Sequence, residues 1–211
     1  MAVIGKAGLK FSHLFSSLRV RNSSQLGLLQ QEDRKIFGKN TSRAEIEKRF
    51  HELLSSNGPA LLRLARSYTK TSSDRDDLFQ DIALAIWRAL PGFRHESSER
   101  TFVFRIANNR AMTFLAERRP ATEPDDVIEV PDPGLGPEAE LSRDPEGLRL
   151  TKAIQVLPIE YRQVITLMLE GLSYSEISGV LGISESNVGV RLNRARQMLR
   201  RLLEESANAR R

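Results

Sequence analysis

SYSEISGVLGISESNVGVRLNRARQMLRRLL, residues 173–203, is the stretch that decides the fold. Ser173 and Glu176 form the S-x-x-E pattern of a capping box, which begins a helix. Gly182 supplies the left-handed residue that ends such a helix, and Ser184 is suited to cap a second one. The stretch therefore predicts two helices joined by a tight turn, which is the helix-turn-helix arrangement.

The second predicted helix has two distinct faces. Its apolar residues recur at spacings of 4, 3, 4 and 3, so they form one stripe: Val188, Leu192, Ala195, Leu199 and Leu202. The opposite face carries Ser186, Val190, Asn193 and Gln197, flanked by Gly189 and Arg194. Amide and guanidinium groups can read base edges, and Arg191, Arg196, Arg200 and Arg201 can meet phosphates. This face predicts duplex DNA binding; the alternative is a helical hairpin with a solvated basic face.

Composition excludes several classes of site. The 211 residues allow one or two domains, and the absence of cysteine excludes disulfides and cysteine-ligated metals. Only three histidines occur, far apart, so we expect neither a metal site nor a cofactor. No apolar run reaches the about 20 residues of a membrane span, and residues 1–30 lack a secretory pattern. We therefore expect a cytoplasmic protein.

Charge divides the chain. Residues 1–40 and residues 191–211 each carry a net +5, whereas residues 120–147 hold nine acids, one arginine and six prolines. Such an acidic, proline-rich segment cannot bury a core and should be a flexible linker. We expect an all-α chain with these parts: an extension at 1–40, a helical domain at 41–119, a linker at 120–146, a helix-turn-helix domain at 147–206 and a tail at 207–211.

The extension is open to two interpretations. It could be poorly ordered, or even a leader from an upstream start codon. Alternatively, its apolar residues could line a short basic helix that docks on a membrane surface or a partner.

The first domain is expected to contain four helices. Asn57-Gly58-Pro59 should separate the first two, because proline suits a first helical turn. Asp74 should cap the third, at residues 75–90, which Pro91-Gly92 ends. The fourth should cover residues 101–118, with an inward stripe of Val103, Ile106, Ala107 and Phe114, and with Arg110 on that inward side.

The third helix carries a mixed face of Asp77, Gln80, Asp81 and Leu84. An apolar leucine among polar residues favours a protein-docking face over a merely solvated one. A magnesium cluster of Asp74, Asp76, Asp77 and Asp81 is the weaker alternative. Carboxylates stabilise the first turn of a helix in any case, and no phosphate-binding glycine loop accompanies them.

The fourth helix presents Arg105, Asn109 and Met112 away from its inward stripe, with Phe102 and Phe104 on its flanks. Amides, arginines and aromatic rings on one exposed helix are typical of surfaces that bind single-stranded nucleic acid. The alternative is that both phenylalanines belong to the core and the asparagines are ordinary surface residues.

Three segments together resemble the extracytoplasmic-function class of bacterial sigma factors, in the sigma-70 family. DRDDLFQDIALAIWRALPGF (74–93) is similar to the polymerase-binding helix of the first conserved domain. TFVFRIANNRAMTFLAERR (101–119) is similar to the promoter −10 helix, usually T-W-L-x-R-I-A-x-N-x-x-x-D-x-x-R-x-x-R. Residues 157–203 are similar to the second conserved domain, which usually ends G-T-V-K-S-R-L-x-R-A-R-x-x-L. The similarity covers about residues 45–119 and 145–204.

The resemblance implies a protein without catalysis that brings core RNA polymerase to promoter DNA, with an anti-sigma factor as a further partner. Core polymerase would contact Asp77, Gln80, Asp81 and Leu84. The −10 element would contact Asn109, Arg105, Ser97, Ser98 and Phe104, and a flipped base would need a shaped pocket. The −35 element would contact Ser186, Val190, Asn193, Arg194 and Arg191. The acidic linker would thread into polymerase channels.

The chain departs from the family pattern at three positions. Gly189 replaces the usual lysine or arginine, Thr113 the usual aspartate, and Phe102 the usual tryptophan. These departures bear on which promoter sequence is read. A free-standing helix-turn-helix regulator, a nucleic-acid enzyme that uses the aspartates, and a polymerase-binding protein without DNA contact are the alternative functions.

Overall fold

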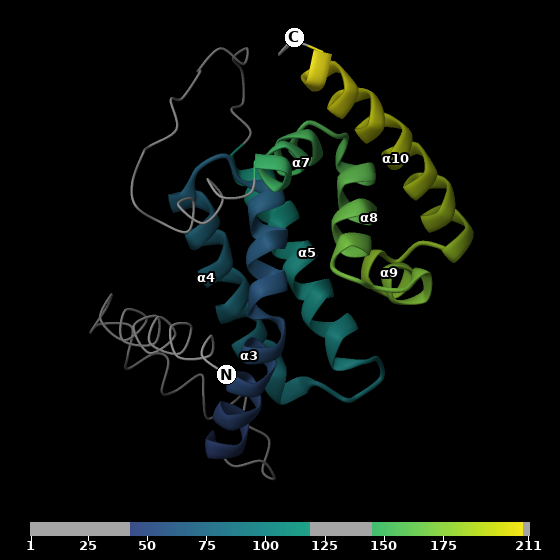
Figure 1. Ribbon diagram of the computed structural model, residues 1–211. Coiled ribbons are helices and arrows are strands. Elements are labelled where there is room, and N and C mark those ends of the chain that lie inside the picture. Colours follow the sequence, from purple (N-terminus) through teal and green to yellow (C-terminus); the bar gives the residue numbers. More distant parts are fainter. Residues whose placement is uncertain (1–42, 119–144, 209–211) are drawn as a thin grey trace, which may run out of the picture.

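The computed structural model describes residues 43–118 and 145–208, and every described element is a helix (Figure 1). The elements are α3 (Arg43–Tyr68), α4 (Ser72–Ala89), the short 3₁₀ helix η1 (Leu90–Gly92), α5 (Glu99–Glu117), α7 (Pro145–Gln155), α8 (Ile159–Leu169), α9 (Tyr174–Leu181) and α10 (Glu185–Asn208). The all-α prediction is confirmed for these residues. The expectations for residues 1–40, the acidic linker and the last three residues lie outside them.

Helix α3 runs without interruption through Pro59, so the predicted break at Asn57-Gly58-Pro59 is wrong. The helix continues because one apolar face spans both sides of the proline: Ile46, Phe50, Leu53 and Leu54 precede it, and Leu61, Leu64, Ala65 and Tyr68 follow it, all buried. Packing of this face outweighs the local cost of an interior proline, which is about 3 kcal/mol.

Helix α4 begins earlier than predicted. Thr71, not Asp74, is its N-cap, because the Thr71 hydroxyl accepts the Asp74 backbone N–H at 3.1 Å. Asp74 instead forms an ion pair with Arg118 at the end of α5. The buried stripe of α4 includes Leu78, Ile82 and Ile86, as its apolar spacing predicts.

The buried face of α5 differs from the predicted inward stripe. Phe104 and Ala111 are fully buried, whereas Arg110 is exposed and Ile106 is only half-buried. The buried face is thus rotated by about a quarter turn, at 100° per residue, because α9 covers a side of α5 that the first domain alone would leave open. The placements of Arg110 inward and of Phe104 on an exposed flank are therefore wrong.

The second half forms the predicted helix-turn-helix. Ser173 and Glu176 make a complete capping box at the start of α9, and Gly182 ends α9 in the left-handed conformation at φ 68°. The Ser184 hydroxyl accepts the Asn187 N–H at 3.3 Å, which caps α10. Ser178 donates its hydroxyl to the Ile183 carbonyl and ties α9 to the turn.

The two halves pack against each other rather than standing apart. Figure 1 shows α3 and α5 between α4 on one side and the second half on the other, and α5 contacts α9 while α3 contacts α7 and α8. Buried residues of both halves join in one continuous hydrophobic cluster. The sequence did not predict this closed arrangement.

Candidate nucleic-acid interface

Helix α10 presents the predicted base-reading face to solvent. Ser186, Asn193 and Arg194 are exposed, and Val190 has 53% of its surface accessible. Its opposite stripe is buried, with Val188, Leu192, Ala195 and Leu199 in the core and Leu202 half-buried. Burial of one stripe fixes which side chains face outward, so the predicted division of the helix is confirmed.

Arg191 is held in place on this face. It is half-buried, and its Nε donates to the Asn187 Oδ1 at 3.1 Å, one turn earlier. This hydrogen bond uses Nε alone and restricts the position of the guanidinium. An arginine restrained in this way loses less side-chain entropy on meeting a phosphate.

Helix α5 presents a second polar surface, of which only part fits the prediction. Arg105 and Asn109 are exposed, as expected. Asn108 is buried, with 5% of its surface accessible, and its Oδ1 accepts a hydrogen bond from Gln163 at 3.0 Å. Phe104 has no accessible surface, so its ring is part of the core and cannot stack on a base in this conformation.

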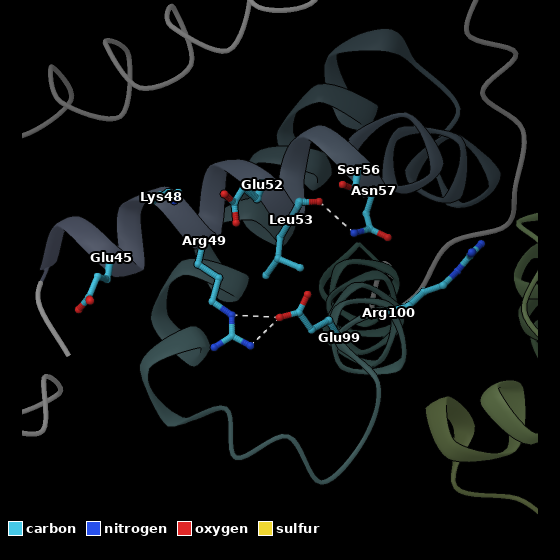
Figure 2. Close-up of a pocket in the computed structure, with 9 residues that line it drawn as sticks. All are labelled: Glu45, Lys48, Arg49, Glu52, Leu53, Ser56, Asn57, Glu99 and Arg100. Atoms are coloured by element: carbon cyan, nitrogen blue, oxygen red, sulfur yellow. Dashed lines mark hydrogen bonds and ion pairs between the residues drawn. The ribbon is translucent and has the colours of Figure 1, made fainter. Parts of the chain in front are cut away.

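The loop before α5 is held by Arg49, a residue that the sequence analysis missed. Arg49 donates from Nε to Glu99 at 3.0 Å, bonds to His95 at 3.0 Å and stacks over the Phe93 ring at 5.2 Å. Figure 2 shows the guanidinium reaching from α3 to Glu99 at the start of α5. Arg49 thereby fixes the loop that contains Ser97 and Ser98. A long-range arginine contact leaves no local pattern in the sequence.

Ser98 is exposed and Ser97 half-buried in this loop. The Ser98 hydroxyl caps α5 by accepting the Thr101 N–H at 3.0 Å. A pocket of about 460 Å³ lies beside the loop and carries charges of both signs (Figure 2). Its lining residues are Glu45, Lys48, Arg49, Glu52, Leu53, Ser56, Asn57, Glu99 and Arg100.

Helix α4 presents the predicted mixed face. Asp77 and Asp81 are exposed, whereas Gln80 and Leu84 are half-buried. Leu84 is thus less accessible than expected, but the four residues still share one side of α4. Among the described residues no group of acids or histidines is arranged to hold a metal ion.

Hydrogen bonds and an ion pair join the two halves in addition to the shared hydrophobic cluster. Arg63 of α3 forms an ion pair with Glu170 at the end of α8, with the Arg63 Nε 2.9 Å from a Glu170 oxygen. This hydrogen bond raises the pKa of the Arg63 guanidinium. The Gln155 amide donates to the carbonyls of Arg66 and Thr69 at 2.8 and 2.7 Å.

Tyr68 and Arg162 form the buried end of the same interface. The Arg162 guanidinium lies 5.7 Å from the centre of the Tyr68 ring. Burial raises the pKa of the Tyr68 hydroxyl and lowers the pKa of Arg162, because each charged form loses its water. Tyr68 is therefore a neutral phenol when the halves are in contact.

Taken together, the fold and its two exposed polar helices define the class of protein. A helix-turn-helix with an exposed amide and arginine face is joined to a second helical unit that carries a polar helix and an acidic face. This is the arrangement of a two-part DNA-binding protein. No helix in residues 43–118 and 145–208 has the length and apolarity needed to cross a membrane.

Comparison with known proteins supplies the family. Residues 53–120 match the family described as "Sigma-70 region 2", and residues 147–199 match "Sigma-70, region 4". The RNA polymerase sigma factor NccH of Alcaligenes xylosoxydans xylosoxydans is 32% identical over 74% of this chain and 88% of its own. The ECF RNA polymerase sigma factor SigM of Mycobacterium tuberculosis is 31% identical over 73% of this chain and 76% of its own.

A solved structure agrees with these sequence matches. The structure of CnrH in complex with the cytosolic domain of CnrY superposes with a TM-score of 0.58 at 30% identity, over 75% of this chain and 90% of that one. CnrH of Cupriavidus metallidurans is itself named an RNA polymerase sigma factor. The chain therefore belongs to the sigma-70 family of RNA polymerase sigma factors, with ECF sigma factors among its relatives, and acts in promoter recognition rather than as a free-standing regulator.

Proposed function

We propose that the chain carries out promoter recognition through three surfaces with separate tasks. The acidic face of α4 binds core RNA polymerase, the exposed face of α5 and its preceding loop bind the −10 element, and the outer face of α10 binds the −35 element. The observation that carries this proposal is the exposure of these polar faces on helices whose opposite sides are fully buried. The protein itself performs no catalytic step.

The −35 surface consists of Ser186, Val190, Asn193, Arg194 and Arg191. The exposed amide of Asn193 can pair with a base edge in the major groove, and Val190 can contact a thymine methyl. Arg191, held by Asn187, is positioned for a phosphate. Tyr174 joins this surface, because 39% of its surface is accessible and it lies next to Gly189.

The −10 surface consists of Asn109, Arg105, Ser97 and Ser98. Asn109 is exposed on α5, and the loop fixed by Arg49 leads into the start of the same helix. A base removed from the stack needs such a fixed loop with hydrogen-bonding groups, because flipping costs a few kcal/mol. Phe104 is not included, since it supports α5 from the core.

Asp77, Gln80, Asp81 and Leu84 form the polymerase-binding surface. Exposed carboxylates around a half-buried leucine can combine a polar rim with a small apolar centre, as interfaces do. We also propose an anti-sigma factor as a partner, since the similar structure of CnrH contains CnrY. Because the protein acts in transcription, we also propose that it acts in the cytoplasm.

Binding to purified core RNA polymerase tests the proposal. We expect the wild-type chain to bind core polymerase, and the double variant Gln80→Ala with Asp81→Ala to bind at least about tenfold more weakly, a loss of about 1.4 kcal/mol. Lys152→Ala is the control, because Lys152 is exposed on α7 and is not part of the proposed surface. Equal affinity of all three proteins for core polymerase would contradict the assignment of this face.

A further inference from the structure

One arginine of α3 contacts the loop before α5 at three places. Residues 93–98 form this loop, between η1 and α5. The Arg49 guanidinium lies over the Phe93 ring where the loop begins, with its Cζ 5.2 Å from the ring centre. It bonds to His95 within the loop at 3.0 Å. It also donates to Glu99, the residue after the loop, at 3.0 and 2.5 Å (Figure 2). A single guanidinium thus connects both ends of the loop with its interior.

The planar fork of the Arg49 guanidinium makes these simultaneous contacts possible. Its Nε and Nη2 both donate to the Glu99 Oε1, and Nη2 also lies 3.0 Å from the His95 Nε2. Because arginine can only donate, the His95 Nε2 must accept, which places the imidazole hydrogen on Nδ1. The single ammonium nitrogen of a lysine could not reproduce this fork while stacking on the Phe93 ring.

The backbone of His95 is strained. Its φ is 59°, in the left-handed region, and no other non-glycine residue within 43–118 and 145–208 has a positive φ. Few non-glycine residues adopt this conformation, and it persists where surrounding groups hold it. The His95 ring is held by the bond from Arg49 and by the Phe93 ring, whose centre is 4.7 Å away. The shape of the loop therefore depends on a side chain of α3.

Local hydrogen bonds secure the two ends of the loop. The Phe93 N–H donates to the Leu90 carbonyl at 3.1 Å, and the Ser98 hydroxyl accepts the Thr101 N–H at 3.0 Å. His95 lies between these ends and is exposed. The contact from Arg49 thus holds the part of the loop that these local bonds do not reach.

A loop held in this way is suited to bind an unpaired base. Ordering a flexible loop at the moment of binding costs conformational entropy, and a loop ordered beforehand avoids most of that cost. Arg49 directs its Nε and Nη2 at the loop itself. Its effect on DNA would therefore pass through the residues that it holds.

We propose that Arg49 is a positioning residue for −10 recognition, whose planar fork holds residues 93–98 in their base-binding conformation before the promoter strand arrives. Arg49 acts through His95 and Glu99 and does not itself touch the base. The inference rests on the proposed function of the −10 surface, whereas the order of the loop does not. A loop in its binding conformation for about one tenth of the time would bind a base about tenfold more weakly.

Run-off transcription tests the positioning role. One template is a promoter recovered from genomic fragments with the wild-type chain and core polymerase, and the other is the same promoter with a single −10 base changed. The measured quantity is the ratio of transcripts from the two templates. A base that the loop cannot hold gains nothing from a fixed loop, so loss of positioning lowers this ratio. Loss of folded protein lowers both transcripts equally and leaves the ratio unchanged.

We expect Arg49→Ala to lower this ratio about tenfold at the −10 position that the wild-type chain reads most strongly. Arg49→Lys should also lower it, since lysine keeps the charge but not the fork. Lys48→Ala is the matched control, because Lys48 is an exposed cation one residue earlier on α3. It should keep the wild-type ratio.

The other outcomes separate this inference from the proposed function. A wild-type ratio in Arg49→Ala would overturn the positioning role and leave the proposed −10 surface standing. A wild-type ratio in Arg49→Lys would overturn the need for the planar fork. If the wild-type chain transcribed every −10 variant equally well, the proposed −10 surface would fail, and the positioning role with it.

NMR of the free protein tests the order of the loop without DNA or polymerase. Order parameters of the backbone amides of residues 94–98 should lie near about 0.85 in the wild-type and Lys48→Ala chains and fall below about 0.6 in Arg49→Ala. Adding Glu99→Ala to Arg49→Ala should loosen the loop no further, because the two side chains act through one contact. A loop that stays equally rigid in Arg49→Ala would overturn the inference, whatever transcription shows.

Discussion

The ring of Tyr174 lies against the backbone of Gly189. A Cβ built at Gly189 would stand 3.5 Å from the Tyr174 Cε2, which is an ordinary contact distance. The first residue of α9 therefore packs directly on α10 at the position where relatives of this family usually carry a lysine or arginine. The space beside Gly189 is narrow but not closed, so a side chain there can be accommodated.

Gly189→Arg should strengthen DNA binding. The added guanidinium can reach a phosphate, so the slope of log Kobs against log salt concentration should steepen by about 0.9. Loss of an interior glycine should also stabilise α10 by about 0.5–1 kcal/mol. Salt titrations of duplex promoter DNA and thermal unfolding measure the two effects. Gly189→Ala is the control, since it should raise the Tm without changing the slope; an equal slope for both variants would refute the phosphate contact.

Asn193→Ala and Arg191→Ala should weaken −35 binding in different ways. Loss of the Asn193 amide should cost about 1–3 kcal/mol at one base pair and relax specificity there. Loss of Arg191 should weaken binding evenly across sequences and reduce the salt slope by about 0.9. Competition binding with single-base-pair variants of the −35 element separates them. Glu205→Ala, an exposed change near the end of α10, should leave both properties unchanged.

Phe104→Ala should lower the free energy of unfolding far more than Phe102→Ala. Phe104 is fully buried, and emptying such a site costs about 3–5 kcal/mol. Phe102 is only half-buried, with its ring centre 4.4 Å from that of Phe93, so its loss should cost less. Urea unfolding gives both free energies. Small and equal losses of unfolding free energy in the two variants would mean that Phe104 is not a core residue.

The protein should lose stability above about pH 10 through Tyr68. Burial raises the pKa of the Tyr68 hydroxyl in the folded chain. The contribution of the neutral phenol to the free energy of unfolding is therefore fully present below about pH 10, the ordinary pKa of tyrosine in the unfolded chain. This contribution is lost as the pH rises from about 10 toward the raised pKa of Tyr68 in the folded chain, by up to about 1.4 kcal/mol per pH unit. Tyr68→Phe should flatten the decline of the free energy of unfolding, measured with urea from pH 9 to 11. Tyr174→Phe is the exposed control, and an identical decline in Tyr68→Phe would refute the assignment.

Local signals predicted the second half well. The capping box at Ser173, the left-handed Gly182 and the cap at Ser184 each act within four residues, so the sequence alone determined where α9 begins and ends and where α10 begins. The apolar stripe of α10 likewise placed Asn193 and Arg194 outward, because one stripe packs on one side of a regular helix.

Long-range packing explains what the sequence did not predict. Pro59 is a local signal for a break, yet the apolar face on both sides of it keeps α3 continuous. Helix α5 is contacted by α3, α4 and α9, so its own spacing did not indicate which side is most deeply buried. The closed interface depends on side chains such as Arg105 and Gln155 that donate to backbone carbonyls, and carbonyls have no sequence signature.

Run-off transcription from a pool of genomic fragments, with core RNA polymerase and with or without this chain, tests the central claim most directly. We predict specific transcripts that appear only with the chain, that share −10 and −35 sequences, and that disappear with Gln80→Ala combined with Asp81→Ala. Tight sequence-specific binding of the chain alone to duplex DNA, with no polymerase-dependent transcript, would contradict the account.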